Sequence, residues 1–142
     1  MMGYMAARTQ HDAAILVMNQ SDRNGKLATS LLEKVGLEVF NTSNGREAVE
    51  LVRASDQGDQ SVRLVIIDEA AASERGVPEL VENLRAADAG VRIILVSEDD
   101  AKGEPSARTS LNIRGCLKKP FRRAQFLGSV LRVIGEPKVR TA

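Results

Sequence analysis

The sequence predicts an α/β fold in which helices cover both faces of a parallel sheet. Two observations support this class: short apolar runs recur along the chain, and amphipathic helical patterns lie between them. Repeated strand–helix units imply parallel strands joined by right-handed crossovers. A chain of 142 residues has room for about one domain with one sizeable core. We therefore expect a (βα)5 three-layer sandwich.

Five apolar runs mark the expected strands. Runs 14–18, 64–67 and 93–96 are continuous and contain many β-branched residues, which is typical of strands buried on both faces of a parallel sheet. Run 37–40 alternates more, as expected of an edge strand, and run 115–117 is the weakest.

Helical spacing of apolar residues appears in four of the intervening or following stretches. These stretches are 27–35, 48–52, 77–84 and 127–134. Gly36 follows the first of them, where the C-terminal cap of a helix is expected. A further helix within 101–112 is expected to be short or irregular, because this window contains Gly103 and Pro105.

Composition argues against several functions. Lys and Arg total 20 against 19 Asp and Glu, and a net charge of +1 does not indicate a nucleic-acid module. One Cys and one His exclude a disulfide framework and metal sites rich in these residues. No apolar run approaches the roughly 20 residues that span a bilayer, and no signal peptide is recognisable. We expect a cytoplasmic protein with one domain, 13–135, and flexible tails at 1–12 and 136–142.

Candidate site residues follow the strands of the predicted sheet. In doubly wound sheets, ligands bind beyond the carboxyl ends of the strands, at the switch point in strand order. For the flavodoxin-like order 2-1-3-4-5, this point receives side chains that follow the first, third, fourth and fifth strands. These are Asn19, Gln20, Asp68, Ser97, Lys118 and Lys119. We expect them to converge on one crevice.

A set of motifs spread over residues 13–135 points to a family. The motifs occupy 15–18, 44–48, 64–68, 93–97 and 117–121, with Gly76 after the third strand. In combination they resemble the receiver domain of response regulators in bacterial two-component systems. The resemblance implies phosphoryl transfer from a histidine kinase to an aspartate of this chain.

The resemblance assigns roles to three residues. Asp68 is the implied phosphoacceptor, since a carboxylate there can act as a nucleophile and form an aspartyl phosphate. Ser97 is the implied hydroxyl that bonds a phosphoryl oxygen, and Lys119 is the implied cation that neutralises phosphoryl charge. Each residue also has a purely structural interpretation. Asp68 would be a solvated acid at a strand end, Ser97 a local cap and Lys119 a surface lysine.

The chain departs from the receiver pattern at several positions. Asn19 and Gln20 stand where the family has an acidic pair that holds Mg²⁺, and amides bring no negative charge. Glu98 stands where a small residue is usual, and it either repels a phosphoryl group or points to solvent and opens the fourth helix. Cys116 replaces an aromatic switch residue, and a buried small hydrophobe is its simpler interpretation.

These departures predict a degenerate receiver, or pseudo-receiver. We expect a protein–protein interaction module with weak or no phosphorylation, no enzymatic activity and no cofactor. Asp68 and Lys119 are expected to form a metal-free ion pair that locks one conformation.

The expected partner is a histidine kinase or a downstream effector, and a homodimer stays open. The expected contact surface consists of the fourth helix (within 101–112), the fifth strand (115–117) and the fifth helix (around 127–134). Arg122, Arg123 and Arg132 are expected to be exposed on it. No contact with nucleic acid or membrane is expected.

Two alternatives stay open. The first is a functional receiver that uses Mg²⁺ and is phosphorylated on Asp68. The second is a small flavodoxin-like enzyme or cofactor binder, which the lack of a G-x-G-x-x-G or Walker A pattern disfavours.

Overall fold

Five parallel strands form one sheet in the order β2-β1-β3-β4-β5. The computed structural model describes residues 11–18, 23–55, 60–71, 76–97 and 113–135. The strands are β1 (His11–Val17), β2 (Glu38–Thr42), β3 (Gln60–Asp68), β4 (Ile93–Ser97) and β5 (Gly115–Lys118). The predicted strand order is confirmed, including the position of the alternating strand β2 at an edge of the sheet.

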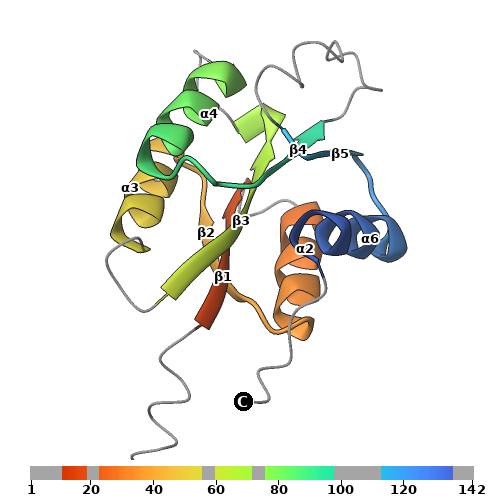
Figure 1. The fold of residues 1–142 in the computed structure, drawn as a ribbon. Coiled ribbons are helices and arrows are strands. Elements are labelled where there is room, and N and C mark those ends of the chain that lie inside the picture. The colour runs from red at the N-terminus through yellow and green to blue at the C-terminus, as the bar shows by residue number, and fades with distance from the viewer. Residues whose placement is uncertain (1–10, 19–22, 56–59, 72–75, 98–112, 136–142) are drawn as a thin grey trace, which may run out of the picture.

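Helices cover both faces of this sheet, as Figure 1 shows: α3 and α4 lie on one face, and α2 and α6 lie on the other. The helices are α2 (Arg23–Lys34), α3 (Gly45–Ser55), α4 (Gly76–Ala87) and α6 (Arg123–Ile134), with a short 3-10 helix, η1 (Glu69–Ala71). The three-layer sandwich is thereby confirmed. No helix in the described part of the chain is long and apolar enough to cross a membrane.

Two apolar cores form because neighbouring residues of a strand point to opposite faces of the sheet. In β3, Ile66 belongs to the core beneath α2 and α6, and Ile67 belongs to the core beneath α3 and α4. Both side chains are fully buried. The central strands read as continuous apolar runs because both of their faces are covered.

Strand β1 begins two residues before the predicted domain start at Ala13. His11 pairs with Gln60 along the sheet, and the Asp12 carboxylate forms an ion pair of 2.8 Å with Arg63. The prediction that residues 11 and 12 belong to a flexible tail is therefore wrong. The apolar run could not reveal them, because pairing and an ion pair hold these polar residues in the strand.

The prediction that Cys116 is a buried small hydrophobe is wrong, because this side chain is exposed. Burial alternates along β5: Gly115 and Leu117 are half-buried, whereas Cys116 and Lys118 are exposed. A Cβ added at Gly115 would lie 3.1 Å from Ser129 Oγ of α6. Gly115 and Leu117 therefore face α6, and the intervening Cys116 faces the opposite side.

Three glycines in the described ranges, Gly36, Gly76 and Gly135, have backbone conformations that other residues rarely adopt. Gly36 ends α2 with a φ of +94°, which confirms the predicted helix cap. Gly76 begins α4 with a φ of +84°.

Several predictions concern residues outside the described ranges. These are the helix within 101–112, the tails at 1–10 and 136–142, and the positions Asn19, Gln20 and Glu98.

Candidate functional site

Three of the predicted site residues meet at the carboxyl ends of β3, β4 and β5. Asp68 ends β3, Ser97 ends β4, and Lys119 directly follows β5. Asp68 lies beside Val96 in the β3–β4 register, and Ser97 lies beside Lys118 in the β4–β5 register. The Lys119 amide donates to the Ser97 carbonyl at 2.8 Å. The parallel register therefore places the three residues at one edge of the sheet.

Asp68 and Lys119 form a buried ion pair. Lys119 Nζ donates to Asp68 Oδ2 at 2.7 Å, and the two side chains are 8% and 2% exposed, respectively. The Ala70 amide donates to Asp68 Oδ1 at 2.9 Å, so both carboxylate oxygens have a partner. Burial of a carboxylate requires such partners, because an unpaired charge in an apolar interior is costly. Neither a solvated acid nor a surface lysine describes this pair.

Ser97 contacts a second carboxylate. Its hydroxyl donates to Glu69 Oε1 at 2.8 Å. Glu69 is exposed and is the first residue of η1, directly after Asp68. The sequence alone predicts no role for Glu69, because its partner is 28 positions away. The one available signal was an acid directly after the predicted phosphoacceptor.

Of the other predicted positions, the structure describes Cys116 and Lys118 but not Asn19 and Gln20. Asn19 and Gln20 lie outside the described residues, and Cys116 lies on β5, exposed. Within the described ranges, no group of three or more His, Cys, Asp or Glu side chains is placed to hold a metal ion. Among the described residues, the Asp68 cluster comprises Asp68, Ser97, Lys119 and Glu69, which are joined by the Asp68–Lys119 ion pair and the Ser97–Glu69 hydrogen bond.

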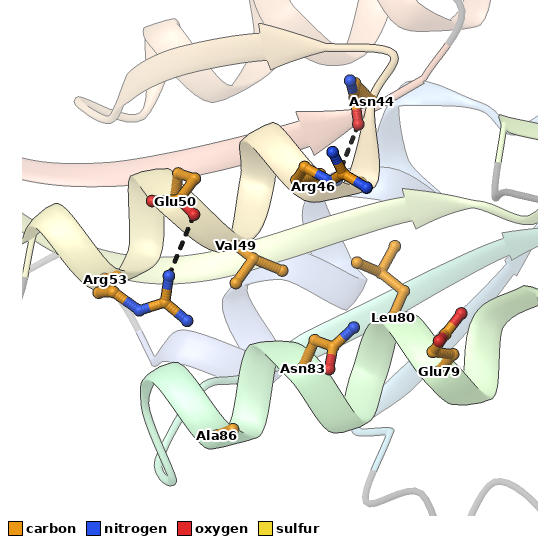
Figure 2. Close-up of a pocket in the computed structure, with 10 residues that line it drawn as sticks. Asn44, Arg46, Val49, Glu50, Arg53, Glu79, Leu80, Asn83 and Ala86 are labelled. Atoms are coloured by element: carbon orange, nitrogen blue, oxygen red, sulfur yellow. Dashed lines mark hydrogen bonds and ion pairs between the residues drawn. The ribbon is translucent and has the colours of Figure 1, made fainter.

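A cleft of about 830 Å³ lies between α3 and α4 (Figure 2). Val49 of α3 and Leu80 of α4 point toward one another across it. Arg53 on its rim forms an exposed ion pair of 3.1 Å with Glu50. The residues that line the cleft include no member of the Asp68 cluster, so the two features are separate.

Solved structures with the same fold come from several receiver domains. The signal receiver domain of a putative Luxo repressor protein from Vibrio parahaemolyticus aligns with a TM-score of 0.71 at 14% identity, covering 88% of this chain and 90% of that chain. Chemotaxis protein CheY4 of Vibrio cholerae aligns with a TM-score of 0.69 at 19% identity, covering 87% of this chain and 98% of that chain. At these identities the likeness concerns the fold.

A third solved structure is the receiver domain of a sensor histidine kinase from Pseudomonas aeruginosa, which has a magnesium ion coordinated in its active site cleft. It aligns with a TM-score of 0.70 at 20% identity and covers 89% of this chain and 98% of that chain. No curated protein is significantly similar to the chain in sequence.

The family comparison agrees with the geometry. Residues 15–131 match the response regulator receiver domain, which covers well over half of the chain. The match includes Asp68, Ser97 and Lys119, which meet at the carboxyl edge of the sheet. The chain therefore belongs to the family of response regulator receiver domains of two-component signalling.

Proposed function

We propose that this receiver domain is a protein–protein interaction module with weak or no phosphorylation. The observation that carries the proposal is the engagement of both Asp68 oxygens within the protein, by the Lys119 ammonium and the Ala70 amide. Charge-assisted hydrogen bonds of this kind are strong. They stabilise the unmodified carboxylate, and they hold Asp68 and Lys119 together without a phosphoryl group.

We further propose that the site works without Mg²⁺, because the residues present fit this ion poorly. Mg²⁺ takes oxygen ligands and usually binds through carboxylates. The two positions where the family has an acidic pair carry the neutral amides of Asn19 and Gln20. Lys119 already neutralises Asp68, and Glu69 accepts a hydrogen bond from Ser97.

Treatment with acetyl phosphate, with and without Mg²⁺, tests both statements. Intact-mass spectrometry of the full chain should show no stable adduct on Asp68. The double variant Asn19→Asp/Gln20→Asp restores the acidic pair and should form an Mg²⁺-dependent adduct, while Asp68→Asn serves as the negative control. A stable Mg²⁺-dependent adduct on Asp68 of the unmodified chain, with NMR shift changes that reach α6, would overturn the proposal.

The retained Asp68, Ser97 and Lys119 favour a second candidate, a functional phosphoacceptor. In that reaction an Asp68 oxygen attacks phosphorus, and the P–N bond to the kinase histidine breaks with its electron pair left on the imidazole. Lys119 and Ser97 would stabilise the transferred group. An Mg²⁺ titration followed by NMR separates the two candidates, because only the second requires metal-dependent shifts around Asp68.

We propose β5 and α6 as the partner surface. Residues 113–135 contain six basic residues and no Asp or Glu; the basic residues are Arg114, Lys118, Lys119, Arg122, Arg123 and Arg132. All of them except Lys119 are exposed. A symmetric homodimer through this surface would bring like charges together, so the charge favours a different partner with an acidic surface. Such a partner is a histidine kinase or a downstream effector.

Charge reversal tests this surface. Arg122→Glu/Arg123→Glu should abolish the capture of a kinase or effector that the unmodified chain retains from its source cell. The matched control is Arg53→Glu on α3, which should leave capture unchanged. Equal loss with both variants would contradict the surface.

Receiver domains are signalling modules. We propose that this one catalyses no reaction of its own and works in the cytoplasm.

A further inference from the structure

The Ser97–Glu69 contact is not explained by the local structure of η1. Asp68 already caps this short helix, since its Oδ1 accepts the Ala70 amide. Glu69 instead directs its carboxylate to the end of the neighbouring strand, where Oε1 accepts the Ser97 hydroxyl at 2.8 Å. The same serine accepts the Lys119 amide through its carbonyl. Glu69 is thereby linked through Ser97 to the residue that neutralises Asp68.

Among the described side chains of the Asp68 cluster, the charges do not cancel. Lys119 pairs with Asp68, and Glu69 adds a second carboxylate on the other side of Ser97. A serine hydroxyl has one proton to donate. When Glu69 accepts this proton, a phosphoryl oxygen at Asp68 cannot accept it at the same time. A phosphoryl group would also meet the negative charge of Glu69.

We propose that Glu69 is a resident anion that occupies the Ser97 hydroxyl and sets the state of the site without a phosphoryl group. Glu69 acts as a positioning residue, because it works through Ser97 and not on a substrate. This inference rests on the proposed phosphorylation-independent function and adds a cause for it within the described residues. Glu69, which directly follows the phosphoacceptor position Asp68, would account for part of the expected weak binding of a phosphoryl group.

Three substitutions separate the two effects of Glu69. Glu69→Gln keeps an oxygen acceptor for Ser97 but removes the charge, and Glu69→Ala removes both. Glu69→Asp keeps the charge on a side chain that is one methylene shorter and draws it back from Ser97. The matched control is Glu82→Gln, an exposed glutamate on α4.

The first measurement uses inorganic phosphate as the probe and requires no metal. Binding is followed by NMR of the Ser97 and Lys119 amides in the full chain. Glu69→Ala should bind phosphate roughly tenfold more tightly than the unmodified chain, the effect expected of one charged competitor. Glu69→Gln should lie between the two, and Glu82→Gln should equal the unmodified chain.

The second measurement is the rate of adduct formation with acetyl phosphate and Mg²⁺. It is made in the unmodified chain and in Asn19→Asp/Gln20→Asp, each with and without Glu69→Ala. The substitution should raise the rate by about tenfold in whichever background reacts.

The outcomes distinguish this inference from the proposed function. A reaction of the unmodified chain would contradict the proposed function, while a faster reaction of its Glu69→Ala variant would still support the role of Glu69. If Glu69→Ala changes neither phosphate affinity nor adduct rate by more than about twofold, the inference is overturned.

Discussion

Lys119 is expected to contribute more to stability than any of the exposed cations, because it neutralises a carboxylate that is only 2% exposed. Replacing Lys119 by Met leaves the Asp68 charge buried without its cation. Loss of one partner of a buried pair costs about 3 kcal/mol or more. We expect the free energy of unfolding in urea to fall by that amount for Lys119→Met.

The double variant Asp68→Asn/Lys119→Met provides the control for this prediction. It removes both charges, so it should recover most of the lost stability and lie within about 1 kcal/mol of the unmodified chain. Lys118→Met, at the exposed neighbouring position, should change stability by about 0.5 kcal/mol or less. A Lys119→Met variant as stable as Lys118→Met would show that the pair is not stabilising.

Ser129 differs from Lys119, because its buried polar atom is expected to destabilise the fold. Its hydroxyl is buried in α6 and has no hydrogen-bond partner in the described structure. An unsatisfied hydroxyl costs about 1 kcal/mol or more. Ser129→Ala should therefore stabilise the protein by about 1 kcal/mol more than Ser30→Ala, an exposed serine in α2 that reports helix propensity alone.

The Ser129 hydroxyl also limits the size of the side chain that position 115 of β5 can accommodate. An added Cβ at Gly115 would lie 3.1 Å from Ser129 Oγ and 3.4 Å from Ile94 Cγ1. Gly115→Ala should be destabilising alone and less so when Ser129 is also Ala, as urea denaturation would show. Equal cost in the two backgrounds would place the crowding at Ile94 instead.

The residues of the site were predictable to different degrees. Asp68 and Lys119 follow apolar strands whose carboxyl ends meet, so topology and the receiver motif place them together. The contact of Glu69 depends on the direction of an exposed side chain in a 3-10 turn, which no periodicity encodes. Cys116 was mispredicted because a short strand gives too few residues to reveal which face is covered.

At the scale of elements, Arg63 connects three of them. Its guanidinium contacts Asp12 of β1 at 2.8 Å and the Ile134 carbonyl at the end of α6 at 2.9 Å. These contacts are only partly exposed to solvent. Arg63→Ala should therefore lower the free energy of unfolding by about 2 kcal/mol and speed amide hydrogen exchange in the last turn of α6.

Arg53→Ala is the matched control for the contacts of Arg63 with Asp12 and Ile134. Arg53 pairs with Glu50 within α3, and both side chains are more than half exposed. Exposed pairs of this kind contribute about 0.5 kcal/mol or less. If the two variants lose the same stability, or if Arg63→Ala leaves amide hydrogen exchange in α6 unchanged, the Arg63 contacts do not stabilise the end of α6.

The elements themselves were largely predictable, and the reason is burial. Each of β1, β3 and β4 has apolar residues on both faces, so their sequences are unbroken runs. The helical spacing predicted for 77–84 is confirmed in α4, because its apolar residues are all buried: Val77, Leu80, Val81 and Leu84. In α6, the expected core residues Val130 and Ile134 are buried, whereas Leu127 and Leu131 are only half-buried and Phe126 is buried in addition. The polar start of β3 was missed because Arg63 is held by partners 51 and 71 positions away.

The whole molecule depends on one sheet that separates two cores. The core beneath α2 and α6 and the core beneath α3 and α4 share the strands but contain different side chains of them. Each core consists of one face of the sheet and the helices that cover it. The sheet couples the two cores, because displacing a strand exposes both of its faces.

Adjacent residues of β3 test this coupling. Ile66→Ala and Ile67→Ala remove a fully buried side chain from opposite cores, and each should cost about 3 to 4 kcal/mol. A domain of this size is expected to unfold as a single cooperative unit. Methyl NMR signals from Leu32 of α2 and Leu84 of α4 should therefore disappear at the same urea concentration in both variants. If Ile67→Ala releases the Leu84 signal while Leu32 stays native, the two faces unfold separately, and the sheet does not transmit strain between the cores.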